Sequence, residues 1–322
     1  MPWFDMPLEQ LKQYVVTEAA PPDFDVFWQG SLSDSAKFDL LPQFTPFGGD
    51  IYRQVRVWDV SFSGFMGQRI KGWLLLPPDR GAKYPCVVSY VGYTGGRGLP
   101  VEHLALPVAG IGCFVMDTRG QGCSSGSTGD TPDEGVCGPQ RPGFMTRGIE
   151  SRESYFYRRV FTDAVRAVEA AAAHPEVDSA RIGVAGASQG GGISIATAAL
   201  SPRVKLLMAD VAFLCHYQRA VTLVDTSPYN EISHYLKAHR HRVDMVFNTL
   251  AYFDGIHFAP RIKARALFSV ALMDDTCPPS TGFAVYNRIT APKEMKVYPF
   301  NNHEGGGAFQ VLERLQFAKS YL

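Results

Sequence analysis

A Gly-Ala-Ser-Gln-Gly pentapeptide at 186–190 is the feature that most constrains the fold of this chain. The apolar run at 181–185 predicts a short buried strand before it, and the small-residue segment at 191–200 predicts a helix after it. A G-x-S-x-G sequence between a strand and a helix is typical of a sharp turn that holds its serine in a strained conformation. The neighbouring residues must be small, because a Cβ there would clash with the strand or the helix.

Ser188 is the candidate nucleophile on this reasoning, since such a turn exposes the serine hydroxyl. The backbone N–H of Gln189 then points toward any oxyanion that forms on Ser188. The alternative interpretation is a glycine-rich helix start that packs tightly or holds a phosphate. This segment lacks the lysine of a phosphate-binding P-loop.

The composition argues against several classes of protein. Of 322 residues, 46% are hydrophobic and 19% are charged, as in ordinary globular proteins, and the formal net charge is zero. A neutral chain without a basic block offers no electrostatic surface for nucleic acid or for an anionic membrane. No run approaches the roughly 18 apolar residues of a membrane helix. The sequence shows no metal cluster, Walker loop or dinucleotide fingerprint, so we expect no metal and no cofactor.

The N-terminal segment has an early acid and no basic region followed by an apolar stretch. This is unlike a signal peptide, and we expect a cytoplasmic protein. In a reducing compartment, six cysteines without a C-x-x-C pair favour free thiols, several of them in the core, over disulfides or zinc ligands. The cysteines are Cys86, Cys113, Cys123, Cys137, Cys215 and Cys277.

The order of the apolar runs predicts an α/β fold. Segments 52–62 and 69–76 alternate polar and apolar residues, as half-exposed antiparallel strands do. Six short apolar runs follow, and helical stretches separate most of them, the clearest at 155–173. Buried strands that alternate with helices indicate a mostly parallel sheet covered on both faces, here the eight-stranded sheet of an α/β-hydrolase. The six runs lie at 86–91, 113–116, 181–185, 204–208, 266–271 and 296–300.

We expect one α/β-hydrolase domain over residues 1–322, because no linker is long enough to separate two domains. Residues 1–50 form an N-terminal arm. The segment from about 211 to 260 is rich in His, Tyr and Phe and does not fit the strand–helix alternation. We interpret it as a helical cap inserted between the sixth and seventh strands.

A nucleophilic serine needs a base that takes its proton and an acid that holds the tautomer of that base. His303 follows the last expected strand, at the edge of a parallel sheet where such sites are built, and is the candidate base. A surface histidine that caps the last helix is the alternative. Most of the histidines in the cap are expected to be solvated or structural: His216, His234, His239, His241 and His257.

The candidate acid is Asp274, the first carboxylate after the seventh strand, from where it can face His303. Asp275 is expected to point the other way and to cap the following turn. Asp210, at the end of the sixth strand, is an outside candidate. Glu304 adjoins the base and is expected to form a structural hydrogen bond.

The second oxyanion donor is expected in the loop at 91–98, after the third strand. Its glycines let the backbone approach a ligand, and Tyr93 is the natural donor through its N–H, with its ring beside the acyl pocket. A flexible surface loop is the alternative. Arg119, after the fourth strand, suits a structural ion pair or backbone clamp better than an anion site.

Three motifs together carry a resemblance to a known family. They are Arg-Gly-Gln at 119–121, Gly-Ala-Ser-Gln-Gly at 186–190 and His-Glu at 303–304. The segments at 143–148, 157–164 and 277–281 support it, and the likeness runs from Phe4 nearly to the C-terminus. The chain resembles carbohydrate esterase family 7, the acetyl xylan esterases and cephalosporin C deacetylases.

This resemblance implies a cytoplasmic, hexameric α/β-hydrolase that removes acetyl groups from small sugars and from cephalosporin C, with active sites facing an internal chamber. By position, it implies Ser188 as nucleophile, Asp274 as acid and His303 as base. Tyr93 and Gln189 would supply the oxyanion N–H groups. Four further residues match positions near the acyl pocket, where ordinary packing is the alternative role: Phe213, Pro228, Thr276 and Cys277.

Two other functions stay open on the sequence. A peptidase of the prolyl oligopeptidase type shares the serine turn, but the roughly fifty residues of the arm cannot build the N-terminal propeller that those enzymes usually carry. A hydrolase-fold binding protein usually has a degenerate triad, whereas all three positions are present in this chain.

Overall fold

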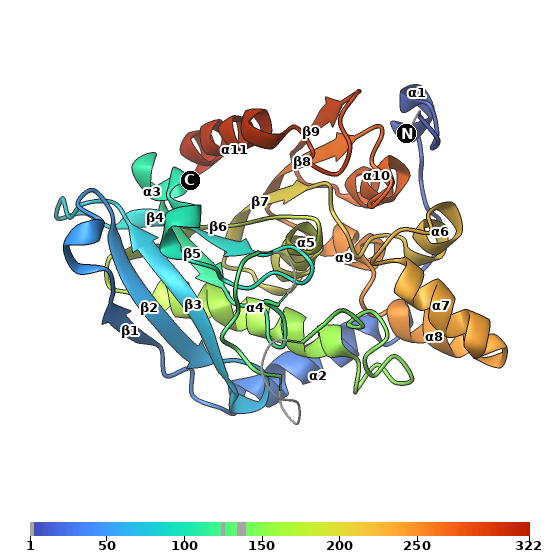
Figure 1. The fold of residues 1–322 in the computed structure, drawn as a ribbon, viewed down its shortest axis with the longest axis horizontal. Coiled ribbons are helices and arrows are strands. Elements are labelled where there is room, and N and C mark those ends of the chain that lie inside the picture. Colours follow the sequence, from blue (N-terminus) through green and yellow to red (C-terminus); the bar gives the residue numbers. More distant parts are fainter. Residues whose placement is uncertain (1–2, 124–125, 134–139) are drawn as a thin grey trace.

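The computed structural model describes residues 3–123, 126–133 and 140–322, which form one nine-stranded sheet with helices on both faces (Figure 1). The strand order is β1-β2-β3-β5-β4-β6-β7-β8-β9. β1, β2, β3 and β5 pair antiparallel in turn, and every neighbouring pair from β5 to β9 is parallel. The strands are β1 (Gln43–Pro46), β2 (Arg56–Ser63), β3 (Arg69–Leu76), β4 (Tyr84–Tyr90), β5 (Gly112–Met116), β6 (Val177–Ala187), β7 (Val204–Asp210), β8 (Arg265–Ala271) and β9 (Lys293–Tyr298).

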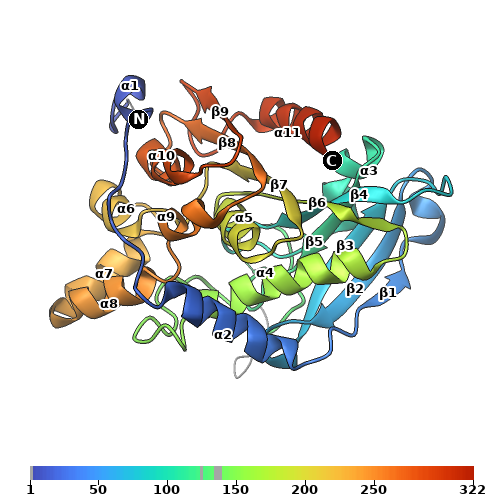
Figure 2. The ribbon, with the colours of Figure 1, turned by 180° about the vertical axis from the view of Figure 1, so that it is seen from behind.

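Helices cover both faces of this sheet. Successive strand residues point to opposite faces, so Val88 lies in the larger core while Val87 lies in a smaller cluster on the other side. Figures 1 and 2 show the two faces from opposite sides. The larger core packs against α2 (Phe24–Ala36), α4 (Phe156–Ala173), α5 (Gln189–Leu200) and α10 (Pro279–Arg288), and the smaller cluster packs against α3 (Ala105–Val108) and α11 (Gly307–Tyr321).

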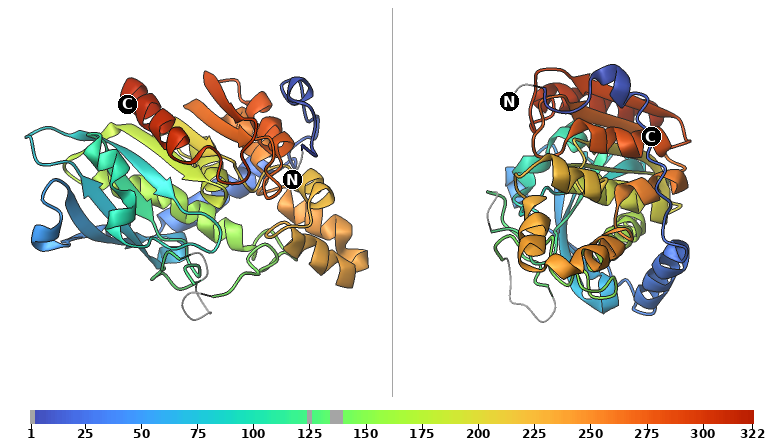
Figure 3. Two further views of the ribbon diagram at one scale, coloured as in Figure 1. Left: turned by 45° about the horizontal axis from the view of Figure 1, so that its top comes forward. Right: turned by 90° about the vertical axis from the view of Figure 1, so that its right-hand side faces the viewer.

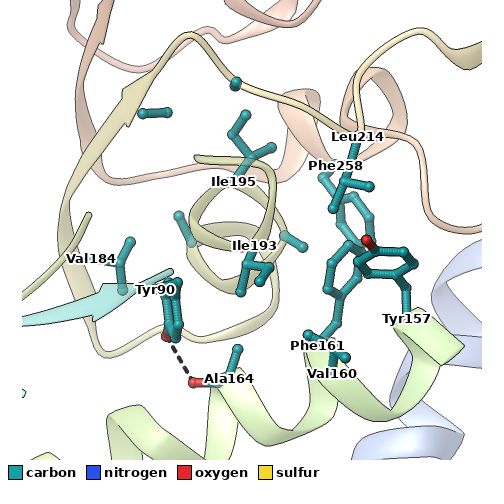
Figure 4. Packing of buried hydrophobic residues seen from close by; sticks show 14 of the residues in the cluster. Tyr90, Tyr157, Val160, Phe161, Ala164, Val184, Ile193, Ile195, Leu214 and Phe258 are labelled. Carbon is teal, nitrogen blue, oxygen red and sulfur yellow. Dashed lines mark hydrogen bonds between the residues drawn. The ribbon is translucent and has the colours of Figure 1, made fainter. Parts of the chain in front are cut away.

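The larger core is aromatic where α4 meets α5 and the cap (Figure 4). The ring of Phe161 packs edge-on against Phe258, with centroids 5.7 Å apart, and against Tyr157 at the same separation. Aromatic rings bury much apolar area and prefer such tilted contacts. The buried hydroxyl of Tyr90 donates to the carbonyl oxygen of Ala164 over 2.9 Å, which ties β4 to α4.

The parallel core agrees with the sequence prediction, but the sheet has nine strands rather than eight. The extra strand is β1, which lies in the arm at 1–50 and pairs with β2 beyond it. The helix α2 also lies in this arm. β1 is four residues long, contains Pro46 and has no buried side chain, so it carries no apolar alternation that sequence reading can detect.

The segment between β7 and β8 is helical, as the sequence predicts for the cap. The N-terminal arm crosses its outer side (Figures 2 and 3). The guanidinium of Arg219 in the cap pairs with Asp5 over 2.7 Å. The arm also contacts α10, where the amide of Asn287 donates to the carbonyl oxygens of Leu11 and Tyr14. The cap helices are α6 (Tyr217–Leu223), α7 (Asn230–Ala238), α8 (Val243–Leu250) and α9 (Gly255–Phe258).

Most of the cysteines are buried as free thiols, as expected of small apolar side chains: Cys86, Cys113, Cys215 and Cys277. Cys137 lies outside the described residues. Within the described ranges, no helix is long and apolar enough to cross a membrane.

Arg119 forms the buried ion pair that the sequence favours over an anion site. Its guanidinium donates to both oxygens of Asp163 on α4, over 2.6 and 2.8 Å, and lies 3.3 Å from Asp133. The side chain of Arg119 is fully buried, and that of Asp163 is 1% exposed. Asp163 also accepts the backbone N–H of Phe65 over 2.7 Å. The pair therefore joins α4 to the loops after β2 and β5.

We predict that Arg119→Met lowers the free energy of unfolding by about 3–5 kcal/mol, because it leaves the buried carboxylate of Asp163 without its cation, whereas Asp133 keeps Arg159. Lys12→Met is the control, since the Lys12–Glu9 pair is exposed and contributes no more than about 1 kcal/mol. Urea unfolding followed by circular dichroism measures both losses. Equal losses in the two variants would contradict this account of Arg119.

Candidate active site

Ser188 sits in a strained turn between β6 and α5. Its backbone has φ 55° and ψ −122°, a region that residues with a Cβ rarely adopt. A Cβ on Gly186 would overlap the backbone of Gly190, and a Cβ on Gly190 would overlap the carbonyl oxygen of Tyr90. The strand, turn and helix therefore approach each other only because glycine stands at both positions, as the sequence predicts.

Backbone hydrogen bonds hold this turn against the next strand. The N–H of Ser188 donates to the carbonyl oxygen of Asp210 over 2.9 Å, and the N–H of Phe213 donates to the carbonyl oxygen of Ser188 over 2.9 Å. The serine side chain remains partly exposed. The strain is thus supported by neighbouring backbone, and the hydroxyl stays open to a ligand.

His303 and Asp274 are in contact. Nδ1 of His303 lies 2.9 Å from Oδ2 of Asp274, whose side chain is fully buried. A carboxylate only accepts hydrogen bonds, so Nδ1 carries the proton and Nε2 of the neutral ring is an acceptor. The other oxygen, Oδ1, accepts the backbone N–H groups of Thr276 and Cys277 over 2.9 and 2.8 Å. This is the pairing that a general base requires.

The serine turn and this pair meet at the carboxyl-terminal edge of β6 to β9. Burial raises the pKa of the Cys277 thiol well above its usual value, while the Ser188 side chain lowers the pKa of that thiol. Cys277 follows Asp274 by three residues, so the turn and the loop after β8 are neighbours. A Cβ on Gly305 would overlap the side chain of Val211, which follows β7. The loop that holds His303 therefore packs against the carboxyl end of these strands.

The other acids have different partners. Asp210 accepts hydrogen bonds from Ser269 and Gln310 over 3.0 and 2.6 Å, and burial raises its pKa. Glu304 accepts the side-chain amide of Asn301 and the backbone N–H of Asn302, a structural role as expected. The turn that the sequence assigned to Asp275 is capped by Asp274 itself, which therefore both faces His303 and orders the 275–277 loop.

The side chain of Gln189 holds the glycine-rich loop after β4, a role that sequence reasoning did not assign. Its Nε2 lies 3.3 Å from the carbonyl oxygens of Val91 and Gly92. Its amide exchanges two hydrogen bonds with that of Gln121, over 3.0 and 3.1 Å, and its Oε1 accepts the hydroxyl of Tyr157 over 2.8 Å. The glutamine of the serine motif and that of the Arg-Gly-Gln motif thus meet as a buried amide pair.

Tyr93 lies in this loop, with its side chain turned toward the cap. Its hydroxyl donates to Oε1 of Glu231 over 2.7 Å and accepts the N–H of Phe144 over 3.1 Å. Its ring lies edge-on to Phe144 and Phe213, with centroids 5.6 and 6.0 Å apart. Burial raises the pKa of Tyr93, so the phenol keeps its proton. Glu231 is a residue that sequence reasoning missed, because 138 positions separate it from Tyr93.

The other residues that the sequence assigns to the acyl pocket come from two segments that meet. Phe213 and Pro228 are buried, and Phe213 packs on Tyr229 with ring centroids 4.4 Å apart. The hydroxyl of Thr226 donates to the carbonyl oxygen of Asp275 over 2.5 Å, which brings the segment before Pro228 to the loop that holds Thr276. Thr276 is partly exposed and Cys277 is buried.

The cap histidines lie elsewhere. His216 and His257 are buried, and burial lowers the pKa of each to about 4, so both are neutral near pH 7. His234 and His241 are exposed. Among the described residues, no group of three or more His, Cys, Asp or Glu side chains is arranged to hold a metal ion.

The chain is similar to several known proteins. The chain is 29% identical over 309 residues to the acetyl esterase Axe7A of Xylanibacter ruminicola, covering 92% of this chain and 65% of that protein. The chain thus spans just under two thirds of the length of this curated relative. Its structure resembles an acetyl xylan esterase from Paenibacillus sp. R4, with 38% identity, a TM-score of 0.92 and coverage of 98% and 100%.

A second solved structure, acetyl xylan esterase 1 from Thermoanaerobacterium sp. JW/SL YS485, matches with 34% identity, a TM-score of 0.89 and coverage of 99% and 100%. The model of the acetyl xylan esterase (AXE1) family matches residues 1–321, nearly the whole chain. A strained serine turn and an Asp–His contact at one sheet edge thus accompany a family match over nearly the whole chain, and the chain belongs to the acetyl xylan esterase (AXE1) family.

Proposed function

We propose that this protein is a serine esterase that deacetylates small acetylated sugars, xylo-oligosaccharides among them, and also cephalosporin C. The observation that carries the proposal is the contact between His303 and Asp274 at the sheet edge where the turn presents Ser188. This order of nucleophile, acid and base along the chain is that of α/β-hydrolase triads. Membership of the family supports the acetyl ester as substrate.

In the proposed mechanism, Nε2 of His303 accepts the proton of the Ser188 hydroxyl as its oxygen attacks the acetyl carbonyl. Asp274 holds the ring with Nδ1 protonated and stabilises the imidazolium that forms. The backbone N–H groups of Tyr93 and Gln189 donate to the oxyanion. The sugar alcohol leaves with the proton of His303, which leaves an acetyl-enzyme. Water that His303 deprotonates then attacks this ester and releases acetate.

The acyl pocket in this proposal consists of Tyr93, Phe213, Pro228, Thr276 and Cys277. Its walls are the buried ring of Phe213 and the ring of Tyr93, which lie against each other. An aromatic wall of this kind admits the methyl of an acetyl group and limits longer chains.

We predict that Ser188→Ala and Asp274→Asn each lower kcat for p-nitrophenyl acetate by on the order of 10⁴-fold, because triad members act as a unit. Circular dichroism should show Ser188→Ala folded, since alanine carries the same backbone strain as serine, and it also checks the fold of Asp274→Asn. Near-full activity of folded Ser188→Ala protein would refute the assignment of the nucleophile.

The two rival functions differ from this proposal in chemistry. Residues 3–50 form α1 (Leu8–Leu11), α2 and β1, without a propeller in this described segment, which favours an esterase over a prolyl oligopeptidase-like peptidase. A binding protein has no need for a strained, exposed serine beside an Asp–His pair. Rapid cleavage of a prolyl anilide would favour the peptidase. Failure of a fluorophosphonate probe to label Ser188 would favour the binding protein.

A preference for short esters follows from the proposed pocket. We predict that kcat/KM falls by on the order of tenfold or more from p-nitrophenyl acetate to the octanoate, because the longer chain meets the aromatic wall. Acetylated xylobiose should be hydrolysed faster than acetylated xylan polymer at equal acetyl concentration. Equal rates on all these substrates would contradict a small-ester specificity.

We further propose a cytoplasmic homo-hexamer, on the basis of the family resemblance alone. In this assembly the active sites face an internal chamber that only small esters enter. Light scattering should give a mass about six times the 35.4 kDa of one chain. A monomeric mass would refute the assembly, and recovery of the protein from a secreted fraction would refute the location.

A further inference from the structure

The loop that carries Tyr93 is anchored to the protein by side chains from three directions. At the start of the loop, the side-chain amide of Gln189 donates to the carbonyl oxygens of Val91 and Gly92. At the far end, Oε1 of Gln121 accepts the N–H of Thr94 over 2.8 Å, where φ of Thr94 is 67°. The third anchor is the side chain of Tyr93 itself, which reaches the cap. A loop with glycines at 92, 95 and 96 needs such anchors, because glycine leaves the backbone free to take many conformations.

Glu231, in the first turn of cap helix α7, is the partner of that third anchor. Oε1 accepts the hydroxyl of Tyr93 over 2.7 Å, and Oε2 accepts the backbone N–H of Met145 over 3.1 Å. The hydroxyl of Tyr93 in turn accepts the N–H of Phe144. One carboxylate therefore joins three separate segments, namely the cap, the loop after β4 and the loop around 144.

The chemistry of this contact requires a carboxylate. Both oxygens of Glu231 face a donor, and a glutamine would present an NH₂ group to one of them. Burial raises the pKa of Glu231, while hydrogen bonds from Tyr93, Met145 and Gly143 and the charge of Arg147 act in the opposite direction. Among the described residues no cation lies within ion-pair distance of this carboxylate, so its hydrogen bonds with Tyr93 and Met145 are its direct partners.

We infer that Glu231 is a positioning residue for the oxyanion site, which it acts on through Tyr93. The inference rests on the proposed esterase function. Fixing the phenol of Tyr93 fixes the ring between Phe144 and Phe213 and with it the direction of the Tyr93 N–H. Displacement of a catalytic group by about 1 Å costs on the order of 10²-fold in rate. The cap therefore contributes to the rate of the chemical step as well as covering the pocket.

Four variants test this inference with p-nitrophenyl acetate: Glu231→Gln, Tyr93→Phe, the double variant of these two, and the control Asp244→Asn. Asp244 is an exposed carboxylate on the neighbouring cap helix α8 and lies outside the proposed machinery. We expect each single variant of the pair to lower kcat by about 10- to 100-fold with KM changed less than about threefold. The double variant should be no slower than the slower single variant, because one contact is lost in all three. Asp244→Asn should match the wild type.

Three outcomes would overturn the inference: an unchanged kcat in Glu231→Gln, an effect confined to KM, or losses that multiply in the double variant. If Glu231→Gln does not fold, Tyr93→Phe decides alone, since it removes only the hydroxyl, and full activity of that variant overturns the inference. Activity of the wild type and of Ser188→Ala is measured in parallel. If the wild type hydrolyses the ester and Ser188→Ala does not, the proposed esterase function holds. An unchanged kcat in Glu231→Gln then contradicts only the role of Glu231.

Discussion

The close approach of backbone at the serine turn is the constraint on which the rest of the site depends. A Cβ on Gly190 would collide with the carbonyl oxygen of Tyr90, and one on Gly186 would collide with Gly190 itself. These contacts let α5 start directly beside the end of β4 and place Ser188 at a left-handed φ. Strain of this kind persists only where surrounding structure supports it, and the hydrogen bonds to Asp210 and Phe213 give that support.

Sheet topology supplies the remaining groups. β6 to β9 are adjacent and parallel, so the loops that follow them open at one edge. Ser188 follows β6, Asp274 follows β8 and His303 follows β9. Asp274 and His303 are therefore 29 positions apart in the chain and still lie 2.9 Å apart. The crevice at the carboxyl ends of parallel strands is the usual place for such sites.

Two pairs of buried polar side chains hold the loops at this sheet edge in place. The ion pair of Arg119 and Asp163 joins α4 to the loops after β2 and β5. The amide pair of Gln121 and Gln189 joins the serine turn to the loop after β4. Buried polar groups are costly unless they are fully hydrogen-bonded, and these satisfy one another. Most residues of the Arg-Gly-Gln and Gly-Ala-Ser-Gln-Gly motifs are thus explained by positioning rather than by contact with substrate.

The parallel strands, the serine turn, and the positions of Asp274 and His303 after neighbouring strands could be predicted from the sequence, because apolar periodicity, glycine spacing and order along the chain are local signals. The sequence did not show β1 or α2, whose residues lack strong apolar alternation, and it placed a turn cap on Asp275 that Asp274 provides. The role of the Gln189 side chain and the contact of Glu231 with Tyr93 are visible only once the elements have packed together. Hydrogen bonds between residues far apart in sequence leave no periodic pattern, since they depend on how the elements pack after they have formed.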